Sequence, residues 1–449
     1  MRTCLALLAL SLLVGPAIAS DISVQEALLR AKPAVALVVV EVASEVRVRC
    51  AGGPEVTVAP QSLRETGTGW FVGPRGWMIT NAHVVSSAQR PTATVKRQLT
   101  ERGVRQACGE ISAGALDTAI GRASIKFAPS LYVMLSNGMR IPAQIAKYSA
   151  PVVGEAMSGR DLALLKLEAT DMPTLPLADS AGAQIGDRIH ILGFPGVVLS
   201  HELLNTSARV EASVTSGAIS GFKQDVTGHR VIQTDAPAAW GNSGGPVVTS
   251  LGEVLGVLTF VSLSGADGSI VQGFNFVIPS AAVHGFLEGT GARPDEPSRF
   301  NAAWHAGLRD YFEGRYSRAE RQFAEANRLV PELPDVRRMT AEAKHPPPQP
   351  FPWTAAATTL TGLSLGAWAI LGWRRWQRNR FRIRPSEVLR LLEEAPQRPV
   401  ILDVRDDPAY DKSPVRIPGA VHVPPEGLEQ GNPELTNVDS ARIVVAYCT

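Results

Sequence analysis

The sequence predicts a multidomain protein that begins with an all-β barrel or sandwich domain at residues 20–290. A short helical segment at 298–344, a membrane helix at 353–373 and part of an α/β domain at 384–449 follow it. Three observations carry this prediction. The chain has 449 residues, which is too long for one ordinary domain. Short runs of Val, Ile and Thr, divided by Gly, Pro and Asn, fill the first part. An uncharged stretch, followed by arginines, separates the last part from the rest.

The composition excludes two classes of protein. Hydrophobic residues make up 45% of the chain and charged residues 19%, which is typical of a globular protein and not of a disordered one. The formal net charge is +2, and no long basic run offers a track for phosphates. We therefore expect no nucleic-acid partner.

The first residues are typical of an export signal. A charged start precedes an apolar run from Leu5 to Val14 and a small-x-small tripeptide that ends at Ala19. The run is shorter than the ~20 residues that a membrane-spanning helix needs. The sequence therefore predicts a signal peptide at 1–19 that is removed after Ala19.

Three local motifs in the β domain point to one kind of chemistry. His83 follows the apolar strand Trp77 to Thr80, and Asp161 stands at the head of the apolar run that ends at Leu167. Ser243 lies in the turn Gly-Asn-Ser-Gly-Gly-Pro, whose glycines let the backbone bend sharply. In such a turn the amides of Gly241 and Ser243 can point at one place and form an oxyanion hole. The chain order His, Asp, Ser is one of the known orders of a catalytic triad.

The roles of these side chains follow from their proton chemistry. A serine hydroxyl is a poor nucleophile, so His83 would take the proton of Ser243 and return it to the leaving amine. Asp161 would hold the tautomer of His83, and it is favoured because the apolar run behind it buries its strand. The carboxylates that compete for this role are Asp117, Asp187 and Asp235. The chemistry needs only side chains and backbone amides, so we expect neither a metal nor an organic cofactor.

Together these motifs resemble the HtrA/Deg branch of the trypsin-like serine proteases over about 66–285. The segments that carry the resemblance are 66–72, 77–83, 233–236, 241–246 and 275–280. The resemblance implies two six-stranded β-barrels with the site between them, and an endopeptidase that acts on proteins or peptides. The chain departs from the family at Ala239-Trp240, where Asn-Pro is usual, and no PDZ domain follows the protease segment. Self-association is a further expectation.

Two features near the site remain open from the sequence. Pro237 stands six residues before the serine, where the floor of the specificity pocket is expected, so small or medium aliphatic side chains are the expected substrates. Trp240 would narrow the rim of that pocket. The stretch between His83 and the strand at Leu131 is much longer than the resemblance predicts. It either partly covers the active-site cleft or is a surface insertion.

The cysteines divide between two chemical environments. Cys4 would leave with the signal peptide, whereas Cys50 and Cys108 would meet an oxidising compartment. They either form a disulfide or remain two thiols, because the sequence does not show whether they are adjacent.

Residues 298–344 resemble a single tetratricopeptide repeat. The small and aromatic residues that carry this resemblance are Gly307, Ala319, Phe323, Ala326 and Pro331. One repeat cannot bury its apolar face alone. We expect these helices to dock on the protease, or to bind another chain.

A proline-rich linker at 345–352 leads to the predicted membrane helix at 353–373. Tryptophans stand at both ends of that helix, and Gly362 and Gly366 have a spacing that permits close helix approach. Six arginines follow at once, and such arginines stay in the cytoplasm. They are Arg374, Arg375, Arg378, Arg380, Arg382 and Arg384.

The C-terminal region resembles a rhodanese domain. The matching segments are Ile401 to Arg405, Arg416 to Pro424 and Ile443 to Cys448. The resemblance implies that Cys448 stands where a persulfide-forming cysteine is found, with possible sulfurtransferase activity. The family's loop continues past that cysteine, so we expect residues 384–449 to be an incomplete domain.

The sequence as a whole predicts a single-pass protein of the bacterial inner membrane. Its serine endopeptidase domain would face the periplasm, and its rhodanese-like domain would face the cytoplasm. The alternative is a protease fold that binds without cleaving, a sensor or scaffold coupled to a cytoplasmic sulfurtransferase.

Overall fold

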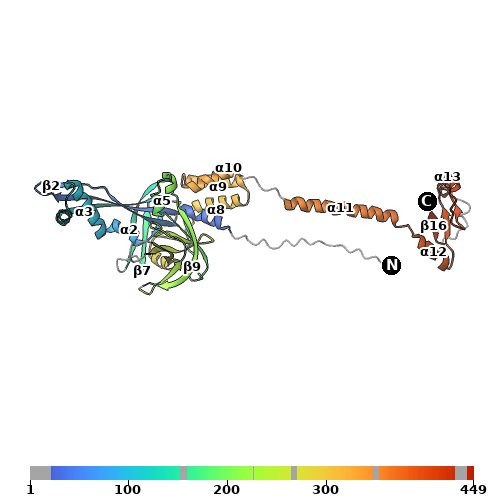
Figure 1. Cartoon of the computed structure of the whole chain (residues 1–449), viewed down its shortest axis with the longest axis horizontal. Coiled ribbons are helices and arrows are strands. Elements are labelled where there is room, and N and C mark those ends of the chain that lie inside the picture. Colours follow the sequence, from blue (N-terminus) through green and yellow to red (C-terminus); the bar gives the residue numbers. More distant parts are fainter. Residues whose placement is uncertain are drawn as a thin grey trace. The chain divides into compact units, whose positions relative to one another are not determined.

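The computed structural model describes residues 22–151, 159–225, 227–263, 270–346, 353–429 and 442–448. The predicted signal peptide and most of the predicted linker at 345–352 lie outside the described residues. The chain forms two compact units, Met1–Pro347 and Pro348–Thr449 (Figure 1).

The first unit opens with a closed β-barrel. Its strands follow the order β1-β3-β4-β7-β6-β5, and the pairing of β1 with β5 closes the ring. Side chains of β1 alternate between the barrel interior and a second buried layer, so the long run of valines is buried on both faces over its first half. The strands are β1 (Val35–Arg49), β3 (Leu63–Gly73), β4 (Trp77–Thr80), β5 (Ser124–Met134), β6 (Arg140–Pro151) and β7 (Gly159–Leu167).

A second closed barrel follows, with the strand order β10-β13-β12-β11-β8-β9. Its interior is filled by Ile, Val, Leu and Ala from every second position. The double β-barrel of a trypsin-like protease, which the resemblance implied, is therefore confirmed. The strands are β8 (Arg188–Gly193), β9 (Ser213–Gln224), β10 (Arg230–Thr234), β11 (Pro246–Thr249), β12 (Val254–Leu263) and β13 (Ile270–Pro279), and the short helices around them are α5 (Gly196–Leu199), α6 (Thr206–Arg209) and α7 (Ser280–Leu287).

The long stretch after His83 is a helical insertion folded against the outer half of β1. α2 (Ala82–Gln89) carries His83 and packs Val84 and Val85 into the core of the first barrel. The insertion follows it as α3 (Ala93–Cys108) and α4 (Ala113–Arg122), and strand β2 (Glu55–Val58) pairs with β1 beside these two helices. Cys50 and Cys108 are joined by a disulfide, with their Cα atoms 5.5 Å apart. The bond ties the end of α3 to the end of β1. β2 and α3 lie at the opposite end of the first unit from β9 (Figure 1).

The helical segment after the second barrel docks on the first barrel. Gly307 lets two helices approach closely, since a Cβ there would lie 2.5 Å from the Phe323 ring. The indole N–H of Trp304 donates to the carbonyl of Leu29 over 2.9 Å. Of the two expected arrangements, the structure therefore shows docking within the chain, while the tetratricopeptide classification itself stays a prediction. The helices involved are α1 (Val24–Ala31), the 3₁₀ turn η1 (Lys32–Ala34), α8 (Arg299–Phe312), α9 (Tyr316–Leu329) and α10 (Pro334–Lys344).

The second unit begins with the long helix α11 (Trp353–Asn379). Among the described residues, no helix combines the length and the apolar character of a membrane span. Thr, Ser and Gly interrupt the apolar residues of α11, so the predicted span at 353–373 is not supported by this finding.

The rest of the second unit is a parallel sheet with the strand order β15-β14-β16. A helix connection between parallel strands is typical of an α/β domain. The elements are α12 (Pro385–Glu394), β14 (Val400–Asp403), α13 (Asp407–Lys412), β15 (Val421–His422), α14 (Pro425–Glu429) and β16 (Val444–Tyr447).

Candidate active site

The antiparallel pairing of β4 with β7 brings the predicted histidine and aspartate together. Thr80 at the end of β4 pairs with Ala163 in β7. His83 lies three residues later, in the first turn of α2, and Asp161 precedes Ala163 by two positions, so both residues lie at the same end of the strand pair. The Asp161 carboxylate contacts His83 twice: Oδ1 accepts the backbone N–H over 3.0 Å, and Oδ2 lies 2.7 Å from Nδ1.

Asp161 is buried and held by neighbouring side chains. Its exposed fraction is 2%, whereas the His83 side chain is 31% exposed. The Thr259 hydroxyl donates to Asp161 Oδ2 over 2.7 Å, and the Asn81 amide donates to the Asp161 carbonyl over 2.9 Å. These contacts fix the orientation of the carboxylate and leave the imidazole accessible from outside.

Thr259 is a site residue that sequence reasoning missed. It lies in β12, is 2% exposed, and donates its hydrogen bond directly to the predicted catalytic aspartate. The available signal was one of two hydroxyl residues, Thr259 and Ser262, within the mostly apolar run Val254–Leu263. A buried polar group of this kind has a hydrogen-bond partner, but the sequence does not say which one.

The serine turn is held by a residue of the first barrel. The Thr68 backbone N–H donates to the Ser243 carbonyl over 2.8 Å, and the Thr68 hydroxyl donates to the Gly241 carbonyl over 2.7 Å. Gly244 also packs tightly, because a Cβ there would lie 2.9 Å from the backbone nitrogen of Asn81. The turn therefore lies against the segment that leads from β4 to His83.

Gly241 has a conformation that a side chain would strain. Its φ is +98°, and a Cβ would lie 2.3 Å from the Phe194 carbonyl oxygen. Within the described residues, the N–H groups of Gly241 and Ser243 have no backbone acceptor. Two unoccupied amides two residues apart in one turn are what an oxyanion site requires.

The competing carboxylates lie elsewhere. Asp117 in α4 pairs with Arg97 at 3.2 Å, Asp187 accepts the N–H of Gln184 over 2.8 Å, and Asp235 accepts that of Ala218 over 2.7 Å. Each carboxylate is thus engaged in its own local structure, and Asp161 has the contacts to His83.

The residues predicted for the specificity pocket are at the surface. Pro237 is exposed, and its carbonyl accepts the Thr215 hydroxyl over 2.7 Å. Trp240, directly before Gly241, is 60% exposed. No carboxylate stands at either position.

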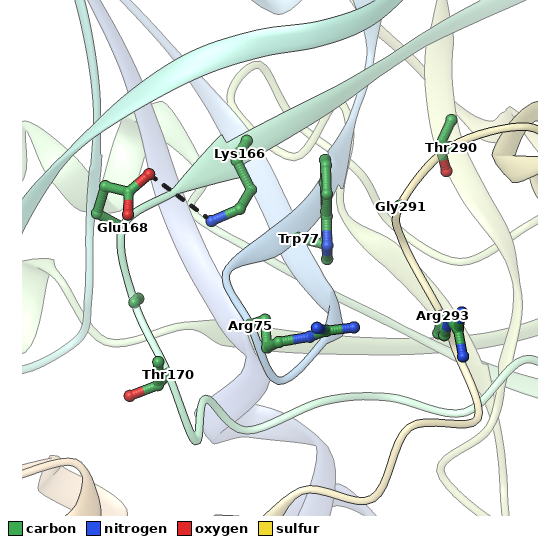
Figure 2. A pocket seen from close by; sticks show the side chains of 9 residues that line it. Arg75, Trp77, Lys166, Glu168, Thr170, Thr290, Gly291 and Arg293 are labelled. Carbon is green, nitrogen blue, oxygen red and sulfur yellow. Dashed lines mark ion pairs between the residues drawn. The ribbon is translucent and has the colours of Figure 1, made fainter.

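A cavity of about 720 Å³ opens at the other end of the β4–β7 pair (Figure 2). Trp77 and Lys166 are directly paired there, and Lys166 lies 3.9 Å from Glu168. Arg75 extends past the end of the Trp77 indole toward Arg293, as Figure 2 shows. This cavity contains neither His83 nor Asp161.

The predicted sulfur-chemistry residue lies in the second unit. Cys448 directly follows β16 and is an exposed free thiol. Beneath it, the Tyr447 hydroxyl donates to Asp403 over 2.6 Å, and Arg405 donates to the same carboxylate over 2.8 Å. The Arg405 guanidinium lowers the pKa of Asp403 well below its usual range.

Comparison with known proteins assigns both units. Residues 67–257 match the trypsin-like peptidase domain, and residues 384–449 match the rhodanese-like domain. Serine endoprotease DegS of Salmonella typhimurium is 27% identical over 221 residues, which cover 48% of this chain and 46% of that protein. DegS of Haemophilus influenzae is 34% identical over 124 residues, covering 26% of this chain and 33% of that protein.

Two further proteins are similar to this chain. A probable periplasmic DegP-like serine endoprotease of Chlamydia trachomatis is 30% identical over 48% of this chain and 31% of its own length. A solved structure of an HtrA-type protease with a tripeptide matches 60% of this chain and 65% of its own, with a TM-score of 0.37 and 23% identity. The chain spans less than half of the length of the three curated relatives named here. It contains a trypsin-type serine protease domain like those of the HtrA and DegS proteases, and a rhodanese-like domain.

Proposed function

We propose that this chain is a serine endopeptidase in which Ser243 is the nucleophile, His83 the general base and Asp161 its orienting acid. The observation that carries the proposal is the double contact of the buried Asp161 carboxylate with His83, at 3.0 Å to the backbone N–H and 2.7 Å to Nδ1. With Nδ1–H donating to Asp161, the other ring nitrogen of His83 is left as the base.

Catalysis then proceeds through an acyl-enzyme. Ser243 Oγ attacks the peptide carbonyl while His83 takes its proton, and the amides of Gly241 and Ser243 stabilise the developing oxyanion. His83 passes the proton to the leaving amine, and water then releases the acyl group by the reverse sequence. Asp161 stabilises the imidazolium formed in each half of the reaction. The protein residues supply every group that these steps require.

Covalent labelling tests this proposal without knowledge of the substrate. A fluorophosphonate probe should modify the full-length protein at one residue, and peptide mass spectrometry should locate the adduct on Ser243. Ser130→Ala, which removes an exposed serine on β5, is the matched control and should label normally. An adduct on another serine, or none in a folded protein, would contradict the assignment.

The exposed Pro237 and Trp240 support a preference for small or medium aliphatic side chains at the cleaved bond. Neither position has a carboxylate that could pair with a Lys or Arg side chain of the substrate. A peptide library that varies only this residue measures the preference directly, and selective cleavage after Arg or Lys would refute it.

We also propose that α11 anchors the protein in a membrane, although no described helix has the apolar character of a typical span, with the protease domain outside and the rhodanese-like domain in the cytoplasm. Large apolar side chains are exposed all along α11, including Leu360 at 66%, Leu365 at 67% and Trp368 at 80%. The one-sided arginines after Trp373 support the orientation.

Thiol accessibility tests this topology. In a Cys50→Ser/Cys108→Ser background, a membrane-impermeant maleimide on intact spheroplasts should spare Cys448 and react after permeabilisation. Labelling before permeabilisation would refute the orientation. Release of the protein by a salt wash alone would refute the anchor.

Sulfur transfer by the second unit is a separate candidate activity. The exposed thiol of Cys448 directly after β16 favours it. A thiosulfate:cyanide assay on the full chain, compared with Cys448→Ser, tests it independently of peptide cleavage. Equal rates for the two proteins would exclude Cys448 from that activity.

A further inference from the structure

A second large cavity, here called the arginine cleft, lies in the first unit between the first barrel, the loop after β8 and the turn between α9 and α10. Its volume is about 900 Å³. The described residues that line it include four arginines and one acid, Glu332. The arginines are Arg64, Arg140, Arg209 and Arg337.

The positive charge of this cleft is only partly neutralised. Glu332 lies 3.4 Å from Arg337, and Arg64 has a long 4.0 Å contact to Glu41. Arg209 donates to the backbone carbonyl of Leu204 over 2.8 Å, and no acid among the described residues forms an ion pair with it. Arg140 lies 5.4 Å from the centre of the Tyr132 ring, which orients the guanidinium without cancelling its charge.

The walls of the arginine cleft are fixed in place by contacts between elements. The Asn137 amide donates to the Pro331 carbonyl over 2.7 Å, which joins the β5–β6 turn to the turn before α10. Lys32 pairs with Asp335 of α10 at 3.1 Å, with both side chains mostly buried. A preformed site loses less conformational entropy when it binds a ligand.

Two contacts connect lining residues of the cleft with the candidate active site. The N–H of Gly196, a lining residue, donates to the Trp240 carbonyl over 2.7 Å, directly before the oxyanion turn. Thr66, another lining residue, precedes Thr68 by two positions in β3, and Thr68 holds the carbonyls of Gly241 and Ser243. Lining residues of the cleft therefore neighbour the oxyanion turn along the chain and through hydrogen bonds.

We infer that the arginine cleft binds an acidic, extended segment of the protein substrate next to the cleaved bond. Guanidinium groups bind carboxylates in a planar, two-pronged geometry. Four of them around one cavity select Asp- and Glu-rich sequences and repel basic ones. This inference rests on the proposed peptidase function and adds a substrate class to it.

Matched peptides test the inference on the full-length protein. Two fluorogenic peptides share one cleavable core and differ in an extension of four Glu or four Gln residues, placed on either side of the core. The Glu extension should lower KM about tenfold on one side, which is the combined effect of two or three exposed ion pairs, with kcat little changed. High salt should abolish the difference, because it screens exposed charges.

Variants locate the effect. Arg140→Gln/Arg337→Gln should remove the preference for Glu and leave cleavage of the Gln peptide unchanged. The matched control is Arg75→Gln/Arg293→Gln at the cavity of Figure 2, which removes the same charge elsewhere on the unit and should leave the preference intact. Equal loss in both double variants would refute the cleft in favour of general electrostatic attraction.

Binding separates this inference from the peptidase proposal. Fluorescence anisotropy on the Ser243→Ala protein should show tighter binding of the Glu peptide than of the Gln peptide, whether or not the chain cleaves. Equal affinity would overturn the inference. A poly-Glu peptide without a cleavable core should compete with the substrate. If it instead raises kcat, the cleft receives a separate effector and the substrate inference is wrong.

Discussion

The two ends of the β4–β7 strand pair each carry an acid close to a basic side chain, yet they differ in nearly every physical property. At one end Asp161 is 2% exposed and contacts His83 at 2.7 Å, with Thr259 as a further donor. At the other end Glu168 is almost fully exposed and lies 3.9 Å from Lys166 (Figure 2). Water screens the second pair, so it contributes little energy and no fixed geometry. Burial and additional donors thus make the first pair the better candidate for catalysis.

The largest expected effect is on kcat/KM, when a residue of the proposed triad at the His83 end is removed. Ser243→Ala and His83→Ala should each lower kcat/KM on an unfolded protein substrate by about 10⁴-fold or more, because members of a triad act as a unit. Initial rates measure this, with circular dichroism to confirm folding. A folded variant that keeps a tenth of the wild-type rate would remove the basis of the comparison.

The next prediction exchanges one acid at each end. Asp161→Asn should lower kcat by about three to four orders of magnitude, because an amide cannot hold the same tautomer of His83. Glu168→Gln makes the same chemical change at the exposed end and should alter kcat by less than twofold. Steady-state kinetics on both proteins decide the matter, and similar losses would show that burial is not what distinguishes the two ends.

A smaller effect is expected for a substitution in the serine turn, Gly241–Pro246. Gly241→Ala should reduce kcat by about 10²–10³-fold, since the new Cβ would displace an oxyanion donor. The control is Gly228→Ala. Gly228 has a similar φ of +84°, and no atom lies within 4 Å of the added Cβ. This substitution should cost about 1 kcal/mol of stability and leave kcat unchanged. If both substitutions affect only stability, Gly241 is not part of the oxyanion site.

The smallest effect sharpens the role of the buried hydroxyl. Thr259→Val removes the hydroxyl that donates to the Asp161 carboxylate. It should lower kcat about tenfold and the free energy of unfolding by about 1–2 kcal/mol. Thr259→Ser keeps the hydroxyl and should restore kcat, even if packing suffers. Equal kcat in the two variants would reduce Thr259 to a packing residue.

Local signals in the sequence were sufficient for part of this description. Trp77–Thr80 is a strand with the bounds that its apolar run predicts, and the strand pairing places Asp161 beside His83. Thr259 and the arginine cleft were not foreseen, because both depend on contacts between segments far apart in the chain. The disulfide was left open for the same reason, since only the fold shows that Cys50 and Cys108 are adjacent.

The insertion after His83 was predicted as one of two alternatives, but its helices were not, although their signals were local. Thr92 and Ser112 cap α3 and α4, accepting the N–H groups of Val95 and Ala115. Such caps are readable from sequence. The inserted segment lies outside the segments that resemble the HtrA/Deg family, so the resemblance predicts no structure for it.

The hydrogen bonds from Thr68 to the serine turn have a consequence for biosynthesis. The ribosome completes the strands of the first barrel, which end at Leu167, before it makes those of the second, which begin at Arg188. A nascent chain with only the first barrel carries His83 and Asp161 but no serine. A second barrel without its neighbour lacks both of these residues, as well as the hydrogen bonds from Thr68. Under the proposed function, the shared site keeps the unfinished chain inert and prevents premature cleavage of the chain and of neighbouring proteins.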